Sequence, residues 1–343
     1  MKKQYKIIAY PTSGGASQYR IRQIAKYINK YAEDAVMIVP ETGVTDGALE
    51  EADIIILQGT VDPKIISQVW AYASEFKKLF VTDLDDFIEV APTHPLYEEH
   101  VKLEAVKWTT GLVKVADLVT TTTPVLADFL KTINPNVEVL PNCLDMDLWG
   151  QTPLKNTSNE IRIAHCGGAG HQEDLTMVKP AIMEILEKYS NVKFIYCGDG
   201  KIWKDKLFED HPRTEYVEPT DVDNWPAKFR SLRIDIGVIP LLDNTFNVCK
   251  SNLKFLENGS YSIPCVLSPT VYSETVKDGE TGLIARTPKE FVKQLSRLIE
   301  DKQLRDKIGQ NAYDDVHKNY DLSTKWQNWL DVYKKYYEEK QKK

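Results

Sequence analysis

The sequence predicts an α/β protein made of two doubly wound domains in tandem. Short runs rich in valine and isoleucine alternate with amphipathic stretches along nearly all of the 343 residues. Such alternation produces parallel sheets covered by helices on both faces. It stops between residues 141 and 160, where proline, asparagine and glycine are frequent, and then restarts. The length also suits two domains.

The first domain is expected over residues 1–145. Strands of a parallel sheet are buried on both faces, so they are predicted at short, mainly apolar runs rich in valine and isoleucine. These runs are residues 5–10, 53–57, 79–82, 118–121 and 137–140. Helices are predicted over residues 17–31, 63–76, 97–115 and 124–131. In the first helix, Ile21, Ile24 and Ile28 share one face and Lys26 and Lys30 another, which is the helical period.

A linker is expected over residues 146–160, followed by a second domain over residues 161–318. Its strands are predicted at residues 161–166, 192–197, 214–217, 234–239 and 264–267. Beyond residue 288 the pattern is helical. The last segment, residues 319–343, is expected to form a helix that packs back on the first domain. Trp326, Trp329 and Tyr333 lie at helical spacing there, which favours packing over a cofactor site.

Composition narrows the class of protein. The 43 basic and 50 acidic residues give a net charge of −7, which disfavours a global electrostatic grip on nucleic acid but leaves a local basic groove open. No apolar run reaches the roughly 20 residues that span a bilayer, and the first is too short for a signal peptide. Five cysteines form no CxxC pair and are odd in number, which favours a reducing compartment. A soluble, cytoplasmic protein is therefore expected.

Ligands of open parallel sheets bind beyond the carboxyl ends of the strands, so the loops there are the candidate sites. The loop after the first strand holds Gly14 and Gly15, whose backbone could approach an anion, although a structural turn explains them equally well. The loop after residues 161–166 is a stronger anion or sugar cradle, because three glycines in four residues precede His171. Two of these glycines, Gly167 and Gly168, are predicted to line the site.

The next two strand ends of the second domain supply weaker candidates. Gly198 and Asp199 repeat the arrangement of a strand followed by glycine, although Asp199 also suits a plain turn. Tyr216 and Val217 end the following strand and are candidates for contact with a nucleotide base.

Residues 247–257 are the richest stretch. A helix beginning at Lys250 would place Lys250, Lys254 and Glu257 on one stripe. Its free N–H groups, two ammonium charges and the hydroxyl of Ser251, with Asn252 beside it, would suit a diphosphate, and Glu257 could accept ribose hydroxyls. The alternative is a surface pair between Lys254 and Glu257.

A carboxylate cluster follows the third predicted strand. Asp83, Asp85 and Asp86 fall within four residues and repel one another unless a cation or a polar ligand lies there. Three interpretations stay open: a divalent-metal site, a cluster that orients an acceptor hydroxyl, and a solvated helix N-cap. His94 could belong to the same rim.

Together these motifs resemble glycosyltransferases of the GT-B fold, specifically the family 4-like group 1 enzymes. The likeness covers most of the chain and is most specific in four stretches, at residues 166–175, 198–200, 235–257 and 264–283. It implies two Rossmann-like domains facing a cleft, with a nucleotide-sugar donor on the C-terminal domain and an acceptor on the other. It also implies retaining transfer, with no metal and no cofactor. Lys250, Glu257, Asp85 and Asp86 would then act in catalysis.

The sequence departs from the family at two places. Family members carry two glutamates seven residues apart; Glu257 matches the second, but the first falls on Cys249. The Arg and Lys that usually neutralise the diphosphate are also missing, and Lys250 and Lys254 are the nearest replacements.

Other functions remain open. One is a metal-dependent GT-A transferase using Asp83 and Asp85; others are a nucleotide-sugar epimerase and a non-catalytic module that binds a nucleotide or glycan. The acceptor could be a glycan, a lipid, a protein or a modified DNA base. Peripheral contact with an anionic membrane through the Lys26 and Lys30 face, or through Lys334 and Lys335, is left open, although solvated helix faces are favoured.

Overall fold

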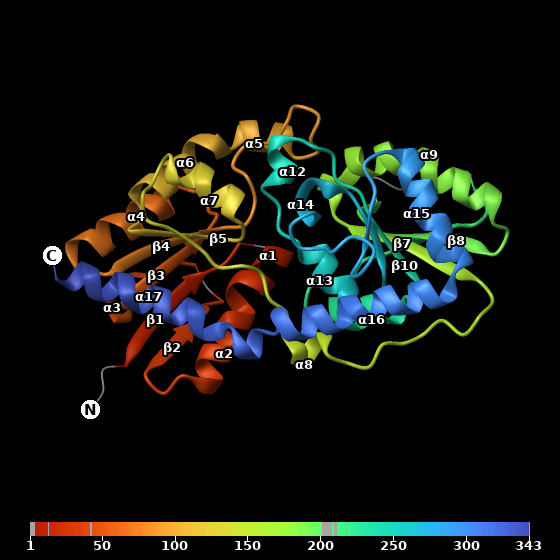
Figure 1. Ribbon diagram of the computed structural model, residues 1–343. Coiled ribbons are helices and arrows are strands. Elements are labelled where there is room, and N and C mark those ends of the chain that lie inside the picture. Colours follow the sequence, from red (N-terminus) through yellow and green to blue (C-terminus); the bar gives the residue numbers. More distant parts are fainter. Residues whose placement is uncertain (1–3, 13, 42, 201–207, 209–210, 343) are drawn as a thin grey trace.

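The computed structural model describes residues 4–12, 14–41, 43–200, 208 and 211–342. It contains two six-stranded sheets in which every strand pairing is parallel. Figure 1 shows the sheets side by side, with the N-terminal half on the left in red to yellow and the C-terminal half on the right in green to blue. The predicted α/β class with two doubly wound sheets is therefore confirmed.

The first sheet has the order β2-β1-β3-β4-β5-β6. Its strands are β1 (Tyr5–Tyr10), β2 (Ala35–Ile38), β3 (Ile54–Gln58), β4 (Leu79–Leu84), β5 (Leu118–Thr121) and β6 (Val137–Val139). Its helices are α1 (Gly15–Ser17), the π-helical η1 (Gln18–Arg22), α2 (Gln23–Tyr31), α3 (Asp46–Glu51), α4 (Pro63–Glu75), α5 (Tyr97–Lys102), α6 (Ala105–Val115) and α7 (Pro124–Lys131). The order places the topological switch between β1 and β3, where ligands of such sheets bind.

Two details of this half differ from the expectation. The edge strand β2 was not predicted. Its apolar run is only four residues long, and two of these residues are not fully buried. The single helix expected over residues 97–115 is two helices, since Glu104 adopts a left-handed backbone with φ of 49° between them. A residue in that conformation cannot continue a right-handed helix.

The second sheet has the order β12-β11-β10-β7-β8-β9. Its strands are β7 (Ile161–Gly167), β8 (Val192–Gly198), β9 (Thr214–Val217), β10 (Ile236–Ile239), β11 (Cys265–Leu267) and β12 (Leu283–Ile284). Its helices are η2 (Ala169–His171), α9 (Gln172–Lys188), α11 (Trp225–Ser231), α12 (Thr245–Val248), α13 (Leu253–Gly259), α14 (Pro269–Tyr272) and α15 (Pro288–Glu300). This strand order is that of dinucleotide-binding folds, with its switch between β7 and β10.

The chain between the sheets and the chain after them tie the two halves together. The connection holds one short helix, α8 (Met146–Trp149), and the C-terminal region holds α16 (Lys302–Asn319), η3 (Leu322–Thr324) and α17 (Trp326–Gln341). Helix α17 crosses back over the N-terminal half (Figure 1). There Trp329 and Tyr333 are buried against a core that includes Ile7 and Ile24. The predicted packing role of the aromatic stripe is thus confirmed.

The lysines considered for contact with a membrane or nucleic acid have partners within the chain. Lys26 pairs with Asp145 at 2.6 Å, and Lys334 pairs with Asp34 at 2.7 Å. Lys335 pairs with a glutamate on β6 at 3.1 Å. These contacts favour the solvated-face interpretation. Across the described part of the chain, no helix is long and apolar enough to cross a bilayer.

Candidate active site

A cleft of about 740 Å³ opens between the two halves, at the carboxyl ends of both sheets. It gathers most of the predicted site residues. These are Gly14, Gly15, Asp85, Asp86, Gly167, Gly168, His171, Gly198, Asp199, Lys250, Ser251, Lys254 and Glu257. Five candidate residues are not among its lining residues: Asp83, His94, Tyr216, Val217 and Asn252. The Tyr216 hydroxyl instead donates to the backbone carbonyl of Gly198 at 3.3 Å, behind the loop.

The glycines of the C-terminal half let two strand ends approach each other closely. A Cβ atom on Gly167 would lie 2.7 Å from the His171 ring and 2.8 Å from Nε2 of His165. A Cβ atom on Gly198 would collide with the backbone of Gly167. Any side chain at these positions would displace the loops, so glycine is required to bring their backbone to the cleft.

His171 faces the cleft as a neutral imidazole. Its Nδ1 lies 3.0 Å from Oδ2 of Asp174, whose Oδ1 accepts hydrogen bonds from the Leu242 N–H at 2.8 Å and from Asn247 Nδ2 at 2.9 Å. Burial holds the pKa of His171 well below its ordinary value, and the charges of two nearby lysines lower it further. Burial also raises the pKa of Asp174. A proton on Nδ1 shared with Asp174 leaves Nε2 able to accept a hydrogen bond from a ligand hydroxyl.

The helix expected to begin at Lys250 begins three residues later, at Leu253. Lys250 lies in the turn between α12 and α13, so Lys250 and Lys254 do not share a helix face. The reason is the anchoring of Cys249, whose backbone carbonyl accepts from Thr123 Oγ1 at 3.1 Å and whose side chain is buried in the core of the N-terminal half. Because Cys249 is held in the N-terminal core, the chain has to leave that core before helix α13 begins at Leu253.

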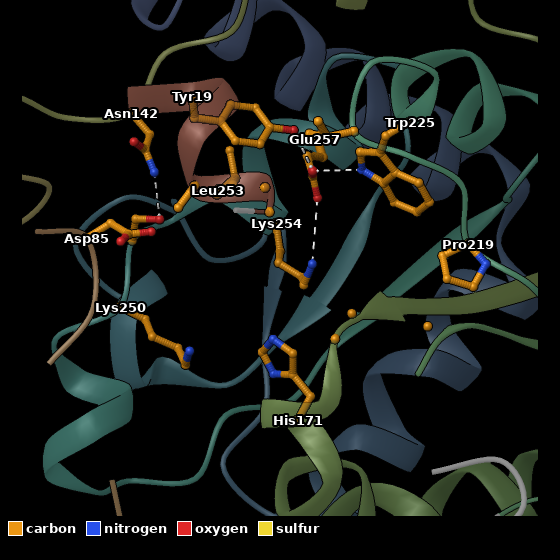
Figure 2. Close-up of a pocket in the computed structure, with 18 of the residues that line it drawn as sticks. Tyr19, Asp85, Asn142, His171, Pro219, Trp225, Lys250, Leu253, Lys254 and Glu257 are labelled. Atoms are coloured by element: carbon orange, nitrogen blue, oxygen red, sulfur yellow. Dashed lines mark hydrogen bonds and ion pairs between the residues drawn. The ribbon is translucent and has the colours of Figure 1, made fainter. Parts of the chain in front are cut away.

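Both lysines nevertheless reach the cleft from this segment. The ammonium group of Lys250 lies 3.5 Å from an Asp86 carboxylate oxygen and 4.3 Å from the centre of the Phe246 ring. The ammonium group of Lys254 lies 3.7 Å from Oε2 of Glu257. Figure 2 shows both side chains directed into the cleft near His171. Two positive charges at one wall make it attractive to an anionic ligand.

Glu257 is the most constrained of the cleft side chains, with 3% of its surface exposed. Its Oε1 accepts hydrogen bonds from the Tyr19 hydroxyl at 2.8 Å and from Trp225 Nε1 at 2.9 Å (Figure 2). Oε2 is buried and has no hydrogen-bond partner among the described residues, with Lys254 as its ion-pair partner. The pair with Lys254 exists, but it is not a plain surface pair, because Glu257 is buried and both side chains line the cleft.

Tyr19 and Trp225 line the cleft but were not predicted. Tyr19 comes from the first half and binds a carboxylate of the second, a contact across 238 positions that no local pattern signals. Its burial and the nearby Glu257 charge raise the pKa of the Tyr19 hydroxyl well above its ordinary value, so the hydroxyl stays protonated and donates. Trp225 begins α11. The one signal in the sequence was the residue type of Trp225, because the indole N–H of a buried tryptophan needs a hydrogen-bond acceptor.

The N-terminal wall is acidic, but Asp83 is not part of it. Asp83 is completely buried, and its two oxygens are held by Arg20 at 3.0 and 2.7 Å and by Thr120 Oγ1 at 2.7 Å. Its carboxylate is therefore committed to a structural ion pair, which counts against a metal site shared by Asp83 and Asp85. The helix N-cap interpretation is also wrong, because the next helix begins only at Tyr97.

Asp85 and Asp86 do line the cleft. Burial, aided by the charges of Asp86 and Asp83, raises the pKa of Asp85 to about 7, and Arg20 opposes this rise. A carboxyl group with this pKa can exchange a proton near neutral pH. On the same side, Asn142 Nδ2 donates to Ser251 Oγ across the cleft at 3.0 Å.

Cys249, the position predicted to match the family's first glutamate, is not among the residues that line the cleft. Its side chain is 2% exposed and packs in the N-terminal core. Burial raises the pKa of its thiol to about 11.

The described residues contain no group of three or more His, Cys, Asp or Glu side chains placed to hold a metal ion. The C-terminal wall of the cleft holds glycine loops, the neutral imidazole of His171 and two lysines, and it adjoins an N-terminal wall with two carboxylates. Such a pair of walls can hold an anionic ligand on one side and a hydroxyl-bearing ligand on the other.

Two Rossmann-like sheets that share a cleft at their carboxyl ends define a protein of the GT-B fold. The family model of the glycosyl transferases group 1 matches residues 160–301, in the C-terminal half of the chain. This match agrees with the resemblance of the sequence motifs to that family. The idea of a variant lacking the first glutamate stays a prediction.

Solved structures support the fold assignment. Anabaena HepE in complex with UDP and glucose superposes with a TM-score of 0.68 at 15% identity, covering 95% of this chain and 98% of that one. Sucrose-phosphate synthase from Thermosynechococcus elongatus gives a TM-score of 0.67 at 13% identity, covering 97% and 99%. A putative UDP-N-acetylglucosamine 2-epimerase from Listeria monocytogenes gives 0.59 at 16% identity, covering 98% and 97%. A search of curated proteins found no significant match.

Proposed function

We propose that the protein transfers a sugar from a nucleoside-diphosphate sugar to an acceptor hydroxyl, without a metal ion. The observation that carries this proposal is the pairing of the two cleft walls. Lys250, Lys254 and His171 from the C-terminal half line one cavity of about 740 Å³ together with Asp85 and Asp86 from the N-terminal half, and the halves meet where Lys250 contacts Asp86 at 3.5 Å. A donor with a diphosphate fits the first wall, and a neutral acceptor that gives up a proton fits the second.

The donor's diphosphate is assigned to the lysine wall, with the backbone of Gly167 and Gly168 beside it. The similar HepE was solved with UDP-glucose bound, which supports a nucleotide-sugar donor. Glu257 is placed to accept a ribose hydroxyl through Oε2, since Oε1 is already occupied by Tyr19 and Trp225. The loop with Pro219 and Asp221, which also lines the cleft, is the nearest candidate to hold the base.

The reaction breaks the bond between the anomeric carbon and the diphosphate oxygen and joins the acceptor oxygen to that carbon. Negative charge builds on the departing diphosphate while the sugar ring becomes oxocarbenium-like. Lys250 and Lys254 stabilise that charge in the transition state, where it is largest. Enclosure by the two halves keeps water from the donor.

We propose retention of the anomeric configuration, as the family resemblance implies. In that course a departing phosphate oxygen takes the acceptor's proton on the same face. One observation favours the inverting alternative: the pKa of Asp85 is raised to about 7, which suits a general base on the acceptor side. Proton NMR of the newly formed anomeric centre separates the two outcomes.

A cytoplasmic location is part of the same proposal. All five cysteines are free thiols and all are buried. A nucleotide-sugar enzyme with reduced cysteines fits a reducing compartment.

The test is a thermal-shift screen with nucleoside diphosphates and their sugars, followed by measurement of nucleoside diphosphate release. A glycosyltransferase is stabilised by one nucleotide class and slowly hydrolyses its donor even without acceptor. A non-catalytic binding module would be stabilised but release nothing, and an epimerase would change the sugar of the donor. No stabilisation by any nucleotide would contradict the proposal.

A further inference from the structure

Two further cavities connect the cleft to the surface of the N-terminal half. The first, called here the side pocket, has a volume of about 280 Å³ and shares Asp86, Gly168, His171 and Lys250 with the cleft. The second, called here the outer groove, has a volume of about 530 Å³ and shares Val90 and His100 with the side pocket. Because each cavity shares lining residues with the next, the three cavities are neighbours in a row, called here the path, from the cleft to the outer groove.

The path lies where the loop before α5 meets α12. The His94 ring packs against Phe246 of α12 at 5.2 Å between ring centres, and Figure 1 shows α5 beside α12 at the junction of the halves. The path is therefore bounded by both halves. It meets the cleft at Asp86, His171 and Lys250, and the loop assigned to the nucleotide base does not line it.

The side pocket carries polar atoms without protein partners. Nε2 of His94 and Nδ1 of His100 are both buried and have no hydrogen-bond partner among the described residues. Nδ1 of His94 accepts from the Leu96 N–H at 3.2 Å, and burial, aided by Lys250, lowers the pKa of His94. The neutral ring therefore carries its proton on Nε2, which is a donor in need of an acceptor such as a hydroxyl oxygen.

The outer groove is apolar in character. Its lining includes Val90, Val101 and Val106, and its only charged side chains, Glu104 and Lys107, pair with each other at 2.9 Å. Large apolar side chains on the same two helices and the turns beside them are exposed to solvent: Leu96, Val101, Leu103 and Val106. A concentration of exposed apolar surface next to a cavity marks a binding site for an apolar group.

We propose that this path holds the acceptor, and that the acceptor is an amphiphile. Its hydroxyl-bearing head occupies the side pocket within reach of Asp86 and His94, and its apolar chain lies in the outer groove. The inference rests on the proposed function, because it takes the cleft as the place of sugar transfer. It names the acceptor's chemistry: a hydroxyl joined to an alkyl or lipid chain.

The test measures binding of methyl, butyl and octyl glucosides, below their micellar concentrations, by calorimetry on the nucleotide-loaded protein. Affinity should rise about twofold to fourfold for each added methylene, as burial of that group in an apolar groove requires. In Val101→Glu this dependence on chain length should disappear. The matched control is Val125→Glu, an exposed valine on α7 that lines neither cavity, and it should keep the dependence.

Equal affinity along the series, or a dependence that survives Val101→Glu, would overturn the proposal. Sedimentation with phosphatidylcholine vesicles that depends on Val101, without binding of monomeric octyl glucoside, would also overturn it in favour of membrane docking. Stabilisation by nucleotide is recorded for every variant. If nucleotide does not stabilise the wild-type protein, the proposed function fails. If nucleotide stabilises it but glucoside affinity does not depend on chain length, this inference alone fails.

Discussion

The two halves of the molecule share an architecture but differ in how their strand ends meet the cleft. The C-terminal sheet has the dinucleotide-binding strand order and brings glycine loops and lysines to its edge. The N-terminal sheet has a different order, and its cleft edge carries Asp85 and Asp86, while its nearby Arg20 is buried. The comparison shows that two sheets of the same fold type can present walls of opposite charge. The charge of a wall depends on which charged side chains are paired in the protein interior and which face the cleft.

The largest effect is expected at the buried ion pair between Arg20 and Asp83, beneath the N-terminal wall. Arg20→Met leaves Asp83 charged and unpaired in the interior, and the free energy of unfolding should fall by about 3–5 kcal/mol. Urea unfolding measures it. The control is Lys302→Met, which removes an exposed pair on α16 and should cost less than about 1 kcal/mol. Equal effects of both substitutions would show that Arg20 is not the neutralising group.

The cationic wall can be tested with Lys250→Ala. Loss of a charge-assisted contact should weaken binding of the cognate nucleoside diphosphate by about 10-fold to 100-fold. Binding of the nucleoside alone should change little, because it lacks the phosphates. Calorimetry with both ligands measures the difference, and Lys250→Arg serves as the charge-conserving control. An unchanged diphosphate affinity would remove Lys250 from the donor site.

The acidic wall predicts a dependence on pH. The pKa of Asp85 is raised to about 7 in the folded protein, whereas an unfolded aspartate has a pKa of about 3.9. Between these values the folded state keeps a proton that the unfolded state has lost, so stability falls as pH rises from about 4 to about 7. Asp85→Asn removes this loss.

The melting temperature of Asp85→Asn should therefore exceed that of the wild type by roughly a few degrees at pH 8, and by less at pH 5. The control Asp128→Asn changes an exposed carboxylate on α7 and should show no such trend. A difference that stays constant with pH would mean that Asp85 titrates like an ordinary carboxylate.

The smallest effect is expected where the two walls touch. Tyr19→Phe removes the hydrogen bond from the N-terminal half to Glu257, which contributes on the order of 1 kcal/mol. Trp225 still donates to the same oxygen. Nucleotide affinity should fall severalfold while unfolding by urea shifts only slightly. A large loss of stability would show that Tyr19 supports the fold rather than the site.

The sequence predicted the fold well because its signals are local. Buried strands such as β1 and β8 are mainly apolar runs, and Gly167 and Gly198 stand at the ends of strands β7 and β8. The short edge strands β2 and β12 were missed, because two to four residues carry too weak a pattern. The split at Glu104 depends on a single backbone torsion that no periodicity reveals.

The site was predicted less completely, because its decisive contacts join distant residues. The pairing of Arg20 with Asp83 spans 63 positions, and it decides which carboxylates face the cleft. The burial of Cys249 in the opposite half displaced the start of α13 from Lys250. Each of these depends on how the halves pack together, and packing is a property of the whole chain rather than of a motif.

The most direct test of the lysine wall is a crystal structure of the protein with its cognate nucleotide sugar, chosen from UDP-, GDP- and ADP-glucose by the thermal-shift screen. We expect the diphosphate oxygens within hydrogen-bond distance of the Lys250 ammonium group and the Gly167–Gly168 backbone. A diphosphate bound out of reach of both Lys250 and the Gly167–Gly168 backbone, or a nucleotide bound outside the cleft, would contradict the account.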